Sequence, residues 1–102
     1  MEDFVNPGGP EVTDVRIYPY EMDRGNHKIM AYADVELSGM LWIKGIRLIK
    51  TKQQGYFVSL PSKRVRGEVF ETVVIDHPEY LRYLRRMIRL KYQEYTGERY
   101  GT

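Results

Sequence analysis

The 102-residue sequence contains no cysteine and only two histidines, His27 and His77. A chain without cysteine has no disulfide framework, no thiolate nucleophile and no cysteine-ligated metal. Two histidines far apart in the sequence are too few for a metal site. No apolar run reaches the roughly 20 residues that a membrane-spanning helix needs, and the acidic start at Glu2 and Asp3 is unlike a signal peptide. We therefore expect a cytoplasmic protein without a metal, a cofactor or a membrane partner.

Motifs of the common enzyme classes are also missing. No Gly-x-x-x-x-Gly-Lys phosphate-binding motif occurs, and Ser62-Lys63 lacks the Ser-x-x-Lys spacing of serine acyl-transfer enzymes. His77 directly precedes Pro78, where capping of a helix is the ordinary explanation. No acid, base and nucleophile can be assembled from these residues. We therefore expect a protein that is not an enzyme, with no catalytic residue and no small-molecule substrate.

The chain has the length and composition of one domain. Its 102 residues are 42% hydrophobic, which suits a single core. Residues 1–10 contain Asn6 followed by Pro-Gly-Gly-Pro and show no periodic pattern, so they are predicted to form a flexible leader. We expect the folded domain to span residues 11–96 and residues 97–102 to form a flexible tail.

Alternating apolar residues predict an antiparallel sheet of about five strands, over residues 11–18, 28–37, 40–50, 56–60 and 69–75. In the second strand, the residues expected to share one face are Ile29, Ala31, Ala33, Val35 and Leu37. The alternation slips at Gly45, which predicts a β-bulge. The last strand is apolar on both faces, so we expect it to be central in the sheet or to meet a partner subunit.

One long C-terminal helix is predicted after these strands. Pro78 and Glu79 suit its first turn, and Thr96-Gly97 ends it. One apolar stripe contains Leu81, Leu84, Ile88, Tyr92 and Tyr95, and a second contains Tyr80, Tyr83, Met87 and Leu90. Together they are about twice as wide as the roughly 100° stripe that one sheet requires. We therefore expect a homodimer that uses the second stripe; the alternative is that both stripes wrap into one monomeric core.

Positive charge is concentrated in the middle of the chain. Residues 40–67 hold seven Lys or Arg residues and no Asp or Glu, whereas residues 1–23 hold six acidic residues and one Arg. The clearest candidates for a nucleic-acid site are Lys63, Arg64 and Arg66, in a predicted loop of residues 62–67. Basic side chains there can neutralise phosphates and release counterions, and an arginine that reaches a groove can pair with guanine.

A second basic group lies on the predicted helix and consists of Arg82, Arg85, Arg86 and Arg89. We expect it to contact phosphates; the alternative is an ordinary solvated helix surface. Four aromatic residues of the strands are of a type that stacks on bases, namely Tyr18, Tyr32, Trp42 and Tyr56. Strand aromatics more often pack in a core, so we do not assign them to the site.

Six short segments carry a further pattern: Val12-Thr-Asp-Val-Arg-Ile17, Ile46-Arg-Leu-Ile49, Gly55-Tyr-Phe-Val58, Pro61-Ser-Lys-Arg64, His77-Pro78 and Glu94-Tyr95. In this order they resemble the stage V sporulation protein G (SpoVG) family, and Pro61-Ser-Lys-Arg64 after a Gly-x-Phe-Val strand is the most specific of them. The sequence departs from the family at Val65-Arg66-Gly67-Glu68, where the family has a Thr-Pro turn that ends in Gly-Glu.

The resemblance implies a bacterial regulator of septation and sporulation that binds DNA or RNA as a dimer built partly by joining sheets. We therefore expect an α+β homodimer with an antiparallel sheet of about five strands and one long C-terminal helix, acting as a nucleic-acid-binding regulator. DNA and RNA, as single or double strands, are open alternatives for the ligand. The alternative function is a protein-interaction module that uses its sheet edge or helix without binding nucleic acid.

Overall fold

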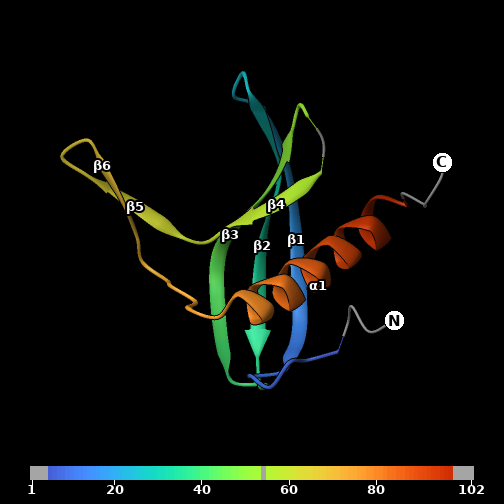
Figure 1. Ribbon diagram of the computed structural model, residues 1–102. Coiled ribbons are helices and arrows are strands. Elements are labelled where there is room, and N and C mark those ends of the chain that lie inside the picture. Colours follow the sequence, from blue (N-terminus) through green and yellow to red (C-terminus); the bar gives the residue numbers. More distant parts are fainter. Residues whose placement is uncertain (1–4, 54, 98–102) are drawn as a thin grey trace.

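The computed structural model describes residues 5–53 and 55–97, which form six strands and one helix (Figure 1). The elements are β1 (Val12–Asp23), β2 (His27–Leu37), β3 (Leu41–Thr51), β4 (Tyr56–Ser59), β5 (Ser62–Val65), β6 (Glu68–Glu71) and α1 (Pro78–Thr96). The expected α+β class, with an antiparallel sheet and a C-terminal helix, is confirmed. The strands divide into a four-stranded sheet with the order β1-β2-β3-β4 and a separate two-stranded sheet of β5 and β6.

The helix α1 crosses one face of the four-stranded sheet (Figure 1). Ala31 and Ala33 on β2 have no exposed surface, and they belong to the same core as Leu84 and Ile88 of the helix. Small side chains at the centre of the sheet leave room for the larger helical residues to fill the core at high density. The pair of alanines is therefore explained by the helix that lies over them.

The bulge expected at Gly45 is confirmed. The pairing of β2 with β3 shifts between Ala33 and Val35, opposite Gly45, whose φ is 85°. The amide of Gly45 donates a hydrogen bond of 3.1 Å to Oδ1 of Asp34. The side chain of Asp34 thus satisfies a backbone donor that the bulge removes from the ladder.

The bulge at Gly45 lies in β3; a second bulge, at Met30 in β2, corrects the prediction for Ile29. The register shifts between Ile29 and Ala31, and Ile29 pairs with Met22 on one side and Ile49 on the other. Ile29 and Ile49 are buried, yet neither belongs to the core beneath the helix, whereas Met30 packs against it. Ile29 therefore faces away from α1, because the extra residue in the bulge reverses the alternation of side chains.

The first strand extends beyond the expected end at residue 18, since β1 continues to Asp23. Pro19 still pairs with Ala31, and the register then shifts before Met22. Proline is tolerated because β1 is an edge strand, where the missing N–H removes no ladder bond on the outer side.

The helix begins and ends as its sequence predicts. Nδ1 of His77 accepts a hydrogen bond of 3.0 Å from the amide of Tyr80, Pro78 is the first helical residue, and Gly97 caps the C-terminus with a φ of 76°. Five residues are buried, and they come from both apolar stripes: Tyr80, Tyr83, Leu84, Ile88 and Tyr92. The wide apolar arc therefore largely packs into the protein's own core, so its width is not in itself an argument for a dimer.

The fifth predicted strand differs most from its prediction. Residues 69–75 were expected to form a strand in the centre of the sheet or at a partner, but β6 covers only Glu68–Glu71 and is exposed along its whole length. A central position is therefore wrong. The apolar side chains of this segment, including Val69 and Phe70, lie instead on a protruding hairpin.

The expected leader and tail fall partly on residues 1–4 and 98–102, which lie outside the described residues. Within the described part, the side chain of Asn6 accepts hydrogen bonds of 2.9 Å from the amides of Gly8 and Gly9. The hydroxyl of Tyr80 donates to the carbonyl of Pro10. Among the described helices, none is long and apolar enough to cross a membrane.

Candidate nucleic-acid interface

The basic segment of residues 62–67 forms a β-hairpin rather than the expected loop. β5 and β6 are joined by the two residues Arg66 and Gly67, with φ values of 53° and 83°. Positive φ at both central positions is the signature of a type I′ turn, whose twist matches that of the two strands. Arginine is an uncommon choice at such a position, which Asn, Asp or Gly normally occupies.

The hairpin extends away from the four-stranded sheet (Figure 1). At its base, the carbonyl of Pro61 accepts hydrogen bonds from the amide and the hydroxyl of Thr72, at 2.9 Å and 3.2 Å. Nη2 of Arg47 on β3 donates to the hydroxyl of Ser62 at 3.2 Å. These bonds hold the base of the hairpin, while its tip projects into solvent.

The three predicted basic residues of this segment are all exposed on the hairpin. Lys63 pairs with Phe70 and Arg64 with Val69, so the two neighbouring cations point to opposite faces of the ribbon. Nη1 of Arg64 donates to the carbonyl of Gly67 at 3.3 Å. This bond brings the guanidinium of Arg64 close to the turn that carries Arg66.

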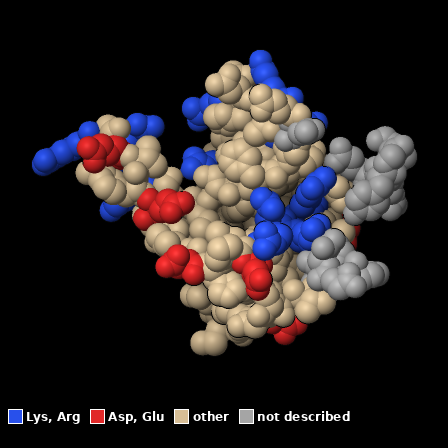
Figure 2. Space-filling model, viewed as in Figure 1, with Lys and Arg blue, Asp and Glu red and all other residues tan. Residues whose placement is uncertain are grey.

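The fold also places acidic residues on the hairpin. Glu68 pairs with Val65, and Glu71 pairs with Ser62. Figure 2 shows Lys and Arg at the end of the hairpin, with Asp and Glu along it and near its base. Glu71 lies at the base of the hairpin and Glu68 directly follows the turn, closer to the tip than Lys63 or Arg64. The acidic residues are thus interspersed with the cations, a distribution that the acid-free run of residues 40–67 does not reveal.

The second predicted group lies on the outward side of α1. Arg82, Arg85 and Arg89 are exposed, and Arg86 is partly buried. The guanidinium carbon of Arg89 lies 4.9 Å from the ring centroid of Tyr56 on β4, and Nζ of Lys50 lies 5.7 Å from the same centroid. Tyr56 therefore joins the helical group to a cation of β3 that the sequence does not assign to the site.

The two basic groups do not merge into one patch. In the view of Figure 2, one group of Lys and Arg lies over α1 and another lies on the hairpin, and both Asp or Glu and a few further Lys or Arg side chains lie between them. A ligand that contacts both groups on one subunit must span this gap. The described residues contain no cluster of three His, Asp or Glu that could hold a metal ion.

A comparison with protein-family models assigns the chain. The model described as SpoVG matches residues 10–94, from the start of β1 through most of α1. The chain belongs to the SpoVG family. The match includes both the β5–β6 hairpin and the basic side of the helix, so the two candidate groups are part of the SpoVG domain itself.

Individual SpoVG relatives agree with this assignment. A protein of Fusobacterium nucleatum is 38% identical over 68 residues, which are 67% of this chain and 69% of the relative. A protein of Archaeoglobus fulgidus is 35% identical over 67% of this chain and 73% of its own length. A protein of Borreliella afzelii is 30% identical over 86% of this chain and 88% of its own length. All three are named as SpoVG septation proteins.

Proposed function

We propose that this SpoVG-family protein is a nucleic-acid-binding regulator of septation type. It contacts its ligand with the exposed cations of the β5–β6 hairpin and with the basic side of α1. The observation that carries the proposal is the hairpin: an exposed ribbon on which Lys63, Arg64 and Arg66 are all accessible. The septation role is taken from the names of the relatives.

The shape of the hairpin suits a nucleic-acid groove. Two paired strands lie about 4.8 Å apart, and the major groove of B-DNA, about 12 Å wide, admits a two-stranded ribbon. An isolated two-stranded hairpin is marginally stable in water, so a ligand that packs against β5 and β6 would also stabilise them. The positive φ of Arg66 strains the backbone. Nucleic-acid binding would account for this strain, because arginine at this position places a guanidinium at the furthest point of the ribbon.

Each basic residue has a distinct part in this proposal. Arg64 and Arg66 are near the turn, and their guanidinium groups can donate two parallel hydrogen bonds to guanine. Lys63, with its compact ammonium group, is suited to a phosphate. The helical residues Arg82, Arg85, Arg86 and Arg89 contribute phosphate contacts, which set affinity and orientation rather than sequence preference.

A homodimer is part of the proposal, supported by the open edge of β3. β4 pairs with β3 only from Arg47 to Lys50, so within the described residues the first half of β3 has no strand on that side. An unpaired edge can accept a strand of a second copy. A two-fold dimer would present two hairpins and two basic helices to the ligand.

Exposed apolar residues favour a second candidate function, a protein-interaction module. Val69, Phe70 and Val74 are all exposed in and after the hairpin. Such side chains can anchor a protein partner. Salt separates the two functions, since a phosphate binder loses affinity steeply as salt rises, whereas an apolar interface does not.

The test is fluorescence anisotropy with labelled duplex DNA and RNA over a salt series. The variant Lys63→Ala/Arg64→Ala/Arg66→Ala removes the hairpin cations, and the control Arg24→Ala/Lys44→Ala/Lys52→Ala removes three exposed cations elsewhere. We expect the hairpin variant, but not the control, to bind more weakly. Its slope of log affinity against log salt concentration should also be smaller, by roughly 0.9 for each duplex phosphate that is no longer neutralised. Equal effects of the two variants, or no binding to either nucleic acid at low salt, would overturn the proposal.

A further inference from the structure

The face of the four-stranded sheet that points away from α1 carries an aromatic surface, which consists of Tyr18, Tyr20, Tyr32, Arg47 and Phe57. One cross-strand row joins Tyr18, Tyr32 and Arg47 on β1, β2 and β3. Phe57 lies on β4, outside this row, and pairs with Ile49 of β3. Its neighbours Tyr56 and Val58 pack against the core beneath the helix. Because side chains alternate along a strand, Phe57 lies on the opposite face.

The rings of this surface are accessible and close together. Tyr18 is 48% exposed, Tyr20 is 45% exposed and Phe57 is 39% exposed. The rings of Tyr20 and Tyr32 lie 5.6 Å apart, tilted by 42°. Tyr18 and Tyr20 of β1 lie beside Tyr32 of β2, and Phe57 lies two strands further on, on β4. Half-exposed aromatic side chains gathered on neighbouring strands are of the kind that marks a binding surface.

A second apolar row makes the surface rigid. Met22, Ile29, Ile49 and Phe57 pair in succession across all four strands. Ile29 and Ile49 are only 3% and 6% exposed. This row exists because the bulge in β2 turns Ile29 away from the helix. The aromatic rings therefore extend from a well-packed sheet rather than from a loop.

Arg47 connects the aromatic surface to the hairpin. Its Nη2 donates to the hydroxyls of Ser59 and Ser62, both at 3.2 Å. No carboxylate among the described residues pairs with it. Ser62 is the first residue of β5 and directly precedes Lys63. A positive charge thus lies at the point where the aromatic rings end and the cationic ribbon begins.

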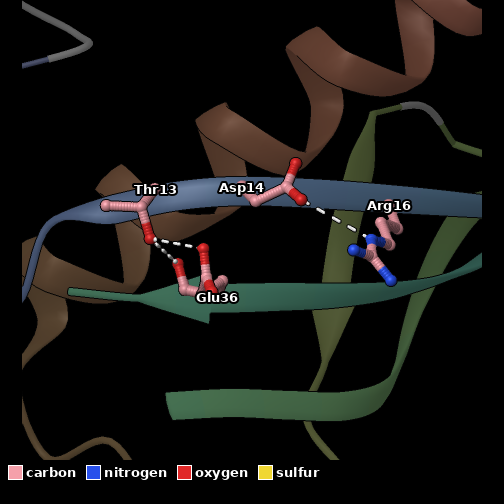
Figure 3. A network of polar contacts seen from close by, with 4 residues as sticks. All are labelled: Thr13, Asp14, Arg16 and Glu36. Carbon is pink, nitrogen blue, oxygen red and sulfur yellow. Dashed lines mark hydrogen bonds and ion pairs between the residues drawn. The ribbon is translucent and has the colours of Figure 1, made fainter. Parts of the chain in front are cut away.

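Acidic residues occupy the other end of this face, where their oxygens already have partners. Asp14 pairs with Arg16 at 3.5 Å, and Oε1 of Glu36 accepts a hydrogen bond of 3.0 Å from Thr13 (Figure 3). The guanidinium of Arg16 lies 4.5 Å from the ring centroid of Trp42. An anionic ligand is therefore directed away from this end and toward Tyr20, Tyr32 and the hairpin.

We propose that the aromatic surface stacks on the unpaired bases of a single-stranded nucleic acid whose phosphates are held by the hairpin cations. A four-stranded sheet with one open face presents flat rings to splayed bases, and stacking tolerates every base because each has a π-face. A duplex keeps its base faces covered and cannot make this contact. The inference rests on the proposed function, because the hairpin supplies the phosphate contacts.

The same surface fits a second copy of the chain less well. Packing with like ends together would bring Arg47 and the hairpin cations of both copies toward each other, and no carboxylate among the described residues pairs with Arg47. Packing with opposite ends together would offer Arg47 only Asp14 and Glu36, whose oxygens already bond to Arg16 and Thr13. A polyanion supplies the missing negative charge at the cationic end. The charges thus favour a nucleic acid over self-association.

Two variants separate stacking from other effects of the rings. Tyr18→Leu/Tyr20→Leu removes the π-faces but keeps apolar area, and Tyr18→Phe/Tyr20→Phe keeps the π-faces but removes the hydroxyls. Tyr95→Leu, an exposed aromatic of α1, is the control. With short labelled single strands of DNA and RNA, we expect the Leu pair to weaken binding roughly five- to hundredfold for each base that no longer stacks, with an unchanged salt slope. The Phe pair and the control should bind as the wild type does, and duplex binding should not change.

Several results would overturn the inference. These are equal single-strand affinity of the Leu pair and the wild type, an equal loss of affinity in the Leu and Phe pairs, or a lower mass of the Leu pair in sedimentation, which would identify a self-association surface. If the Leu pair does not fold, ultraviolet cross-linking of the wild type to a single strand decides the matter. Cross-links in β1 and β2 support stacking, and cross-links confined to the hairpin or α1 exclude it. Failure of the proposed function gives a different result: the variant Lys63→Ala/Arg64→Ala/Arg66→Ala would then bind nucleic acid as tightly as the wild type does.

Discussion

Arg89 on α1 lies over the ring of Tyr56 on β4, with 4.9 Å between the guanidinium carbon and the ring centroid. The two residues are far apart in the sequence, and the docking of the helix on the sheet brings them together. Tyr56 also contacts Tyr92, with 6.4 Å between the ring centroids. One tyrosine therefore packs against the core on one side and holds an exposed cation of the helix on the other.

This contact predicts a measurable coupling between Arg89 and Tyr56. Arg89→Gln should lower the free energy of unfolding by about 0.5–1 kcal/mol, the value of a cation–π contact at an exposed site. A double-mutant cycle with Tyr56→Leu, measured by urea unfolding, isolates the pairwise term. Arg85→Gln, an exposed position on the same helix, is the control. Additive effects of Arg89→Gln and Tyr56→Leu would show that the contact contributes nothing.

The turn of the hairpin predicts opposite effects on stability and binding. Arg66→Asn places a residue that tolerates positive φ before Gly67, and it should stabilise the hairpin by about 0.5–1 kcal/mol. The same change removes the outermost guanidinium, so affinity for nucleic acid should fall. Hydrogen exchange of the β5 and β6 amides measures the first effect, and anisotropy measures the second.

Lys63→Asn is the matched control for that prediction. It removes a positive charge from a strand position of the same hairpin without relieving the turn. Protection of the hairpin amides should not rise in this variant. If Arg66→Asn left both the amide protection and the affinity unchanged, the strain of the turn would not affect stability and the guanidinium of Arg66 would not contribute to binding.

The buried tyrosine at the start of α1 predicts a pH dependence of stability. Burial, together with the neighbouring Tyr83, raises the pKa of Tyr80 above its usual value of 10.0. The folded state therefore holds this proton more tightly than the unfolded chain does. The resulting stabilisation is fully present below about pH 10, and it is lost as the pH rises through the raised pKa of Tyr80.

Tyr80→Phe isolates that contribution. The variant loses the hydrogen bond from the Tyr80 hydroxyl to the carbonyl of Pro10, so at neutral pH it should be less stable by about 1 kcal/mol. The difference in thermal midpoint between wild type and variant should narrow above about pH 10. A difference that stays constant to about pH 11 would show that ionisation of Tyr80 is not coupled to unfolding.

Local signals in the sequence predict much of the fold. Alternation identifies β2 and β3, Gly45 marks a bulge, and His77-Pro78 and Gly97 define the ends of α1, because capping and bulge geometry depend on a few neighbouring residues. The bulge after Ile29 was missed, since no glycine marks it. Its consequence is large, because one inserted residue sends Ile29 to the opposite face.

The candidate site was predicted as a set of residues but not as a shape. Lys63, Arg64 and Arg66 stand out by charge alone, yet the Arg66-Gly67 turn was predicted as part of a loop, because arginine is not a usual residue at positive φ. Lys50 and Arg47 were not assigned, since each gains its role from a partner in another element, Tyr56 for Lys50 and Ser62 for Arg47. Tyr20 was not assigned either, because nothing in the sequence around it indicates a binding role.

The sequence by itself determined the α+β class, the ends of the helix, the position of the positive charge and membership of the SpoVG family, since all of these depend on residue type and short spacings. Only the tertiary structure decided which face each side chain occupies, that the basic segment is a protruding ribbon, and that Tyr18, Tyr20 and Tyr32 share an open face. The physical reason is that exposure and charge proximity arise from strand register and from the docking of α1, and both are set by packing between residues distant in the chain.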